Sequence, residues 1–372
     1  MANILDYLKW RGDLDFSSVP FNPVDNVIFC QLSYLTLDGI VPGIENKDGI
    51  SIDLAVEIYN EKLQKQSGSL SSSVFKYDPE FINALGASKR FGKCRLFCHV
   101  NQIDTKHEKQ FSAISIHIDN NRHFIAFRGT DTSIVGWKED LNMSFQKEIP
   151  SQKEAVKYLE KIASMTKGHL YIGGHSKGGN LAIYAASFCH ERIKKRIINI
   201  YNNDGPGFHE SVIKNTGFEE IREKIYCYVP QSSIVGMFLE HNSDYTIIKS
   251  SQSGIMQHDL YSWDVTHNDL IYIDKVTISS QYVNRTIREW LSRLDNEQRR
   301  QFIEAVYQIL NATGAKTIYD IELSWIRSAY RMLKSYSNIN QNTKKLIWKT
   351  IIELFRCAGD NFKSLLLDGR HE

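Results

Sequence analysis

The residues Gly174-His175-Ser176-Lys177-Gly178 form the pattern Gly-x-Ser-x-Gly, which is typical of a nucleophilic serine. A short apolar segment at 169–173 predicts a strand before the pattern, and small apolar residues predict a helix after it. A strand–turn–helix junction of this kind is so tight that both glycines are needed, and its strain lifts the serine hydroxyl above the sheet edge. The alternative is a glycine-rich turn of an ordinary βα unit. A phosphate-binding loop is disfavoured, because Gly-x4-Gly-Lys-Ser/Thr is absent.

A second stretch, Arg128-Gly129-Thr130-Asp131, follows a predicted strand at 123–127. A nucleophilic serine needs donors for the oxyanion of the tetrahedral intermediate. One donor is normally the amide after the nucleophile, and another comes from a loop that follows an earlier strand. We therefore expect the backbone amides of Lys177 and Thr130 to bind the oxyanion, with the Thr130 hydroxyl as an additional candidate donor. Gly129 would allow the backbone to approach closely.

These two stretches together resemble the class 3 (fungal-type) lipase family of α/β-hydrolases, and within it a bacterial branch of unsettled function. In that family, a strand ending in Phe-Arg-Gly-Ser/Thr, with a Trp and an Asp shortly after, precedes a Gly-His-Ser-x-Gly turn. The matching residues here are Phe127 to Thr130, Trp137 and Asp140, and the resemblance covers roughly residues 95–270. It implies a Ser-His-Asp triad, an oxyanion residue at Thr130 and hydrolysis of carboxylic esters. Lys177 replaces a residue that is usually small or apolar, which would favour an anionic substrate.

The general base is expected downstream of Ser176, if the chain order is serine, acid, histidine. His258 stands in the segment 254–261, a loop after the last predicted strand, where the family carries its histidine. His258 is therefore the preferred candidate, and His267 and His241 are the alternatives. The other downstream histidines are His190, His209 and His371.

The triad acid is harder to assign. The family places it in a segment like Asp-x-Val-Pro, and here Ser233 stands where the aspartate would be expected. A serine cannot hold an imidazolium by charge. Asp204, at the carboxyl end of the strand after the serine turn, is the preferred substitute, and Asp244 is the alternative. A Ser-His pair helped by Ser233 or another polar group also stays open.

The surrounding elements indicate an α/β fold in three parts. Residues 1–92 form an N-terminal segment of helices and loops, with a polar loop at 66–73, and this segment could be a cap. Residues 93–279 alternate strands and helices, which favours an α/β-hydrolase core with a mostly parallel central sheet. Residues 280–372 are helical throughout and form a C-terminal appendage, with a helix cap at 295–298. The predicted strands are 95–103, 111–118, 123–127, 169–173, 197–202, 225–229 and 245–249, and the main predicted helices are 25–35, 51–64, 136–147, 153–165, 318–333 and 343–355.

Composition excludes several other classes of protein. Among 372 residues, 42% are hydrophobic and 24% charged, which excludes a disordered chain. A net charge of +2 is too small to indicate a surface that binds nucleic acid. We expect no transmembrane segment, because no run of about 18 apolar residues occurs. The N-terminus lacks a secretory pattern, so a cytoplasmic location is expected. No second ligand pair accompanies Cys94 and Cys98, so we expect neither a disulfide scaffold nor a metal site.

We therefore expect a serine hydrolase that cleaves carboxylic esters through an acyl-enzyme, with Ser176, His258 and Asp204 as its triad and no cofactor. The resemblance implies a lipid-like acyl ester as substrate. A peptidase or thioesterase would share the same machinery. The alternative from another class is a catalytically weak or inactive hydrolase fold that serves as a binding or regulatory module, which the serine at position 233 favours. The oligomeric state is not determined by the sequence.

Overall fold

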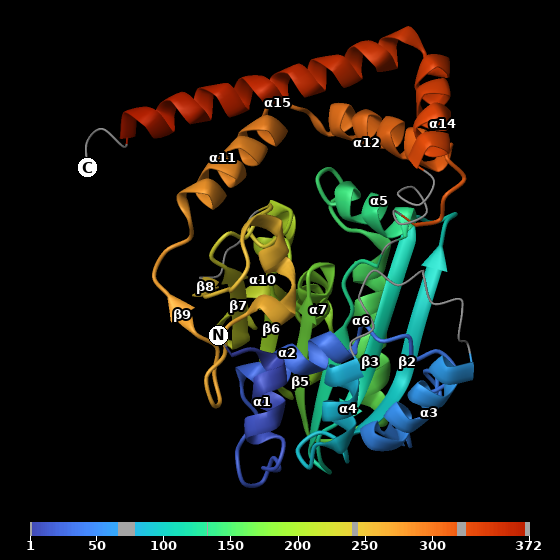
Figure 1. The fold of residues 1–372 in the computed structure, drawn as a ribbon, viewed down its shortest axis with the longest axis vertical. Helices are drawn as coiled ribbons and strands as arrows, with labels where there is room; N and C mark the ends of the chain where they lie inside the picture. The colour runs from blue at the N-terminus through green and yellow to red at the C-terminus, as the bar shows by residue number, and fades with distance from the viewer. Residues whose placement is uncertain (1, 66–78, 132, 240–244, 318–324, 369–372) are drawn as a thin grey trace.

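Among the residues that the structure describes, a nine-stranded sheet is the centre of the molecule, and its strands follow one another in chain order from β1 to β9. The strands β2, β3 and β5 to β9 are labelled in Figure 1. The computed structural model describes residues 2–65, 79–131, 133–239, 245–317 and 325–368. The polar loop predicted at 66–73 lies outside these residues. The strands are β1 (Ile50–Ser51), β2 (Arg95–Asp104), β3 (Lys109–His117), β4 (Arg122–Phe127), β5 (His169–His175), β6 (Ile197–Asn203), β7 (Ile225–Pro230), β8 (Tyr245–Ile248) and β9 (Tyr272–Ile273).

The sheet is parallel only in its centre. Strands β4 to β8 pair in parallel, whereas β1 to β4 and the pair β8–β9 are antiparallel. The physical reason lies in the connections. Only short turns join β2 to β3 and β3 to β4, and these can close hairpins, whereas a parallel pair needs a longer crossover. The chain is thus a mixed α/β protein with a mostly parallel central sheet.

Helices cover both faces of this sheet. Strand β4 shows the division, because Phe124 and Ala126 point into one hydrophobic core while Ile125 and Phe127 point into the other. The second core is covered by α6 (Pro150–Met165) and α7 (Lys177–Phe188). The short helices that complete the crossovers are α5 (Ile134–Asn142), α8 (Glu191–Lys194), α9 (Glu210–Ile213) and α10 (Thr216–Glu219), with 3₁₀ turns at η1 (Arg222–Lys224), η2 (Gly254–His258) and η3 (Leu260–Ser262).

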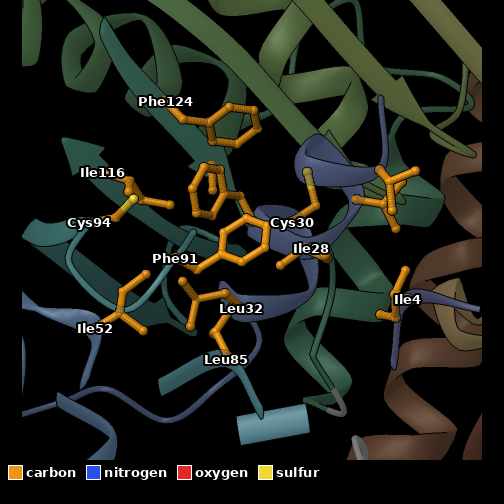
Figure 2. Close-up of a cluster of buried hydrophobic side chains, with 14 of the residues drawn as sticks. Ile4, Ile28, Cys30, Leu32, Ile52, Leu85, Phe91, Cys94, Ile116 and Phe124 are labelled. Carbon is orange, nitrogen blue, oxygen red and sulfur yellow. The ribbon is translucent and has the colours of Figure 1, made fainter. Parts of the chain in front are cut away.

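The N-terminal segment covers the first core. Figure 2 shows Ile28, Leu32 and Phe91 of this segment packed with Ile116 and Phe124 of the sheet. The segment therefore shares its hydrophobic core with β3 and β4, and its division from the central part stays a prediction. Its helices are α1 (Ile4–Arg11), α2 (Pro23–Leu32), α3 (Ile52–Lys65) and α4 (Pro79–Ala87).

The C-terminal appendage consists of long helices at the carboxyl end of the parallel strands (Figure 1). Asp295 caps α12, and Gln298 completes the capping box at the position that the sequence predicts. Within the described residues, no helix is both long and apolar enough to cross a membrane. The helices are α11 (Ile278–Ser292), α12 (Asn296–Asn311), α14 (Trp325–Asn338) and α15 (Gln341–Asp368).

A buried ion pair holds together two parts of the N-terminal segment that lie far apart in the sequence. Arg90 and Asp25 are fully buried, with Arg90 Nη2 2.5 Å from Asp25 Oδ2 and Arg90 Nε 2.8 Å from Oδ1. The guanidinium also donates to backbone carbonyls, including that of Val19, and the Tyr7 hydroxyl donates to Asp25. Each charge is therefore matched by its partner and by hydrogen bonds, which is the condition for burying an ion pair.

Arg90→Leu should lower the free energy of unfolding by about 3–5 kcal/mol, because it leaves the Asp25 carboxylate buried without its cation. Urea unfolding followed by circular dichroism measures the change. The matched control is Lys9→Gln, which removes the exposed ion pair of Lys9 with Glu80 and should cost less than about 1 kcal/mol. An effect of Arg90→Leu no larger than that of the control would contradict this account.

Candidate active site

Ser176 stands in a strained turn between β5 and α7. Its backbone has φ 57° and ψ −134°, a conformation that L-residues rarely adopt. The two flanking glycines make the turn possible. A Cβ on Gly174 would lie 2.2 Å from the backbone of Gly178, and a Cβ on Gly178 would lie 2.0 Å from the carbonyl oxygen of Phe127. The pattern Gly-x-Ser-x-Gly therefore has the close packing that a nucleophile turn requires.

Asp204 and His258 meet at the carboxyl end of the sheet. His258 Nδ1 lies 2.6 Å from Asp204 Oδ2, and the Asp204 side chain is buried. Asp204 follows β6 with φ 53°, and His258 ends η2. Because a carboxylate accepts hydrogen bonds, this contact places a proton on Nδ1 and leaves Nε2 as the free nitrogen of the imidazole. The structure thus brings together the preferred acid and the preferred base.

Ser233 has a role different from the one its position suggested. Its hydroxyl donates to Asp204 Oδ1, and the Gly236 amide donates to the same oxygen at 3.1 Å. Asp204 is not used to close its own turn, because Asn202 Oδ1 accepts the Gly205 amide instead, at 2.8 Å. The serine at the expected position of the acid therefore supports an aspartate supplied by the neighbouring strand.

His175 connects the serine turn to the loop of His258. Its Nε2 lies 2.7 Å from the His258 carbonyl oxygen, and its Nδ1 lies 2.9 Å from the Tyr34 hydroxyl. A carbonyl only accepts, so Nε2 carries the proton and Nδ1 accepts from Tyr34. Burial, together with the neighbouring His258, holds the pKa of His175 well below its ordinary value. A neutral His175 can thus keep this tautomer across the physiological pH range.

Ser176 and His258 lie near each other, but the structure shows no hydrogen bond between their side chains. The rings of His175 and His258 are 4.4 Å apart between centroids, which places the base beside the serine turn. In the part of the chain that the structure describes, no hydrogen bond joins Ser176 Oγ to the imidazole. Such bonds are often long in enzymes without substrate and tighten when it binds.

The loop after β4 packs directly on the serine. A Cβ on Gly129 would lie 2.9 Å from the Cβ of Ser176, so only glycine allows this approach. Thr130 follows, and its hydroxyl donates to Asp140 Oδ2 at 2.5 Å. Burial raises the pKa of Asp140 to about 6, against the opposing effect of the Lys177 ammonium and the Thr130 hydroxyl. The hydroxyl that was a candidate oxyanion donor is therefore engaged with Asp140 in this structure.

The Lys177 side chain is buried and has its charge matched. Lys177 Nζ lies 2.8 Å from Glu139 Oε2 and also donates to the carbonyl and side-chain oxygens of Gln110. Both charged side chains are almost fully inaccessible. The expectation that Lys177 favours an anionic substrate is therefore wrong, because its ammonium is buried against Glu139 and Gln110. Its backbone N–H stands at the first position of α7, where an α-helix offers it no acceptor of its own.

The other candidates fall elsewhere. His267 lies against Trp10, with 5.5 Å between ring centroids. His190 and His209 cap α8 and α9. Three remaining candidates, His241, Asp244 and His371, lie outside the described residues.

The sequence did not point to Tyr34 and Glu139, which contact the residues on either side of Ser176. Tyr34 follows α2 and reaches His175 across 141 positions of the chain, and Glu139 holds Lys177 from α5. Neither residue lies in a recognisable motif. The one signal in the sequence was the lysine directly after Ser176. If that lysine were buried at the tight turn, it would need an acidic partner.

Comparisons with known proteins found similarity to a protein family and to a solved structure. A sequence model of the Mbeg1-like family matches residues 85–308, which include Ser176, Asp204 and His258. Among solved structures, the crystal structure of M37 lipase shares 16% sequence identity, covering 57% of this chain and 68% of that chain with a TM-score of 0.34. No curated protein matches the chain. Because the family model spans more than half of its length, the chain belongs to the Mbeg1-like family.

Proposed function

We propose that this protein is a serine hydrolase of carboxylic esters that works through an acyl-enzyme. The observation that carries the proposal is the contact of 2.6 Å between His258 and the buried Asp204, at the loop that His175 ties to the strained Ser176 turn. A nucleophile, an imidazole and an orienting carboxylate are the three groups that acyl transfer by serine requires.

In the proposed reaction, Ser176 Oγ attacks the acyl carbon while His258 Nε2 accepts the hydroxyl proton. Asp204 holds Nδ1–H and stabilises the imidazolium that forms. The amides of Thr130 and Lys177 bind the oxyanion of the tetrahedral intermediate. His258 then gives its proton to the leaving alcohol, and a water molecule repeats these steps to release the acid. These steps need only groups of this chain and one water molecule, so the proposed reaction includes no cofactor.

Apolar side chains beside the site favour an apolar acyl group. Trp137 and Leu141 of α5 are exposed, on the helix that carries Asp140. Ile255 and Met256 are exposed on η2, directly before His258. Exposed apolar residues on both of these elements would provide contacts for a hydrocarbon chain. The resemblance to class 3 lipases points to the same lipid-like esters.

The binding-module alternative loses its main support. It rested on Ser233 standing in place of an acid, and here Ser233 donates to Asp204, which contacts His258. The ester hydrolase is therefore the function that this geometry supports best. A peptidase or thioesterase would use the same groups and would be distinguished by substrate.

Ser176→Ala should lower turnover of p-nitrophenyl esters by at least about 10³-fold, because loss of the nucleophile leaves only binding and oxyanion stabilisation. The wild type should also react with a fluorophosphonate probe at Ser176, and His258→Ala should abolish that labelling. Kinetics across esters of increasing chain length measure the first effect, and mass spectrometry measures the second. Folded wild-type protein that neither labels nor turns over any ester would refute the proposal.

Asp204→Asn should lower kcat by roughly 10⁴-fold, because an amide presents the wrong hydrogen-bonding pattern and favours the wrong imidazole tautomer. Ser233→Ala should have a milder effect, about 10- to 100-fold, because it removes only a supporting hydrogen bond to the carboxylate. Steady-state kinetics on one soluble ester compare the two variants. If Asp204→Asn were as active as Ser233→Ala, Asp204 would not be the orienting acid.

Thr130→Val tests which group of Thr130 faces the oxyanion. Since the hydroxyl donates to Asp140, the backbone amide is the expected donor, and the substitution should lower kcat by less than about tenfold. A loss of 10²- to 10³-fold, the scale of one missing oxyanion donor, would instead mean that the hydroxyl turns toward the substrate.

A further inference from the structure

The helix α15 has one face that packs and another that does not. Its buried residues, such as Thr350 and Cys357, face α11 and α12, which lie between α15 and the sheet in Figure 1. Hydrogen bonds fix this packing, because Trp290 Nε1 donates to the Thr350 carbonyl and the Tyr282 hydroxyl donates to the Ala358 carbonyl. The position of α15 on the appendage is therefore defined.

A stripe of large apolar side chains runs along the outer side of α15, and its last member, Phe362, also contacts Tyr282 of α11 with 6.4 Å between ring centroids. Trp348, Ile352, Phe355 and Phe362 are 57%, 54%, 72% and 52% exposed. Their spacing of four, three and seven residues places them on one face of the helix. They extend over about 21 Å, at 1.5 Å per residue. An apolar stripe of this length on a helix surface indicates an interaction site rather than scattered exposed residues.

Basic residues border this apolar stripe. Lys345, Lys349 and Arg356 repeat along α15 with the same helical spacing. Among the described residues, neither lysine has an acidic partner. The two acidic residues of α15 whose side chains are described are already matched, since Glu353 pairs with Arg293 and Arg356, and Asp360 lies 3.7 Å from Arg293. The free surface of α15 is therefore apolar along one line and net positive beside it.

The appendage holds this surface at the same end of the sheet as Ser176. On one side, Glu304 of α12 lies 3.0 Å from Lys138 of α5, the helix that follows the Thr130 loop. On the other side, Ser280 and Asn284 of α11 donate to the carbonyl of Ser233, the residue that supports Asp204. The helices beneath α15 are thus attached to both edges of the candidate active site.

We propose that the stripe of α15, defined by Trp348, Ile352, Phe355 and Phe362, docks on an anionic lipid bilayer surface. A helix with tryptophan and phenylalanine on one line and lysines beside it is suited to lie in the plane of such an interface. Tryptophan prefers the level of the lipid headgroups, and each lysine gains attraction from anionic lipids. A second copy of the chain fits less well, because pairing the stripes would bring unmatched lysines together. The proposal does not depend on the ester hydrolase activity.

The experiment measures sedimentation of the full chain with large vesicles. The chain carries Ser176→Ala, so that hydrolysis cannot change the lipid. Vesicles of phosphatidylcholine with about one third phosphatidylglycerol should bind the protein, and pure phosphatidylcholine should bind it much more weakly. The variant Trp348→Ser/Ile352→Ser/Phe355→Ser should lower the partition coefficient by about 100-fold. The charge variant Lys345→Gln/Lys349→Gln should lower it by at least about tenfold.

Ile103→Ser is the matched control, because it removes an equally exposed apolar side chain on β2 and should leave binding unchanged. Equal binding by the stripe variant and the control would overturn the proposal. No binding of the parent protein to anionic vesicles would also overturn it. A dimer in analytical ultracentrifugation that the stripe variant abolishes, without vesicle binding, would instead assign the stripe to a second copy. Loss of esterase activity in Ser176→Ala has no bearing on any of these outcomes.

Discussion

The Asp204 carboxylate is buried, and the arrangement of the whole carboxyl end of the sheet follows from supplying its partners. A buried charge must be matched by hydrogen bonds or by an opposite charge, because its desolvation is otherwise too costly. The donors come from separate segments: Ser233 and Gly236 from the loop after β7, and His258 from η2. Ser233 is in turn held by α11 through its carbonyl. One carboxylate therefore connects the sheet, the base and the appendage.

His175 supplies a second connection, from the opposite side. The N-terminal segment contributes Tyr34, which donates to His175, and His175 donates to the backbone of His258. The imidazole of His258 is thus oriented through its ring by Asp204 and through its carbonyl by His175. In the role of base that we propose for it, a His258 fixed at both points would need little reorganisation to meet a substrate, which is how enzymes gain much of their electrostatic advantage.

The parts of the fold that local pattern determines were predictable from the sequence. The strands and the helices of the βα units lie close to their predicted positions, because alternating and helical spacings report which residues face a core. The antiparallel pairing of β2 to β4 was missed, although the short connections between these strands contained the reason.

The local geometry of the candidate site was predictable where a motif carried it, as in the strained turn at Ser176 and the close approach of the loop at Gly129, and uncertain where long-range contacts decide it. Asp204 and Ser233 stand at the ends of neighbouring strands, and only the folded backbone shows that one supports the other. The burial of Lys177 against Glu139 likewise depends on where α5 lies, which its sequence spacing does not determine.

The ion pair between Lys177 and Glu139 has a consequence for the mobility of α5. α5 carries Glu139, and α7 begins at Lys177, directly after Ser176. Swinging α5 outward would separate two buried charges, at a cost of about 3–5 kcal/mol. Fewer than roughly one molecule in a hundred would then populate such an opening at any moment. The ion pair thus holds α5 against the start of α7 beside Ser176, so the substrate that we propose would reach Ser176 without displacing α5.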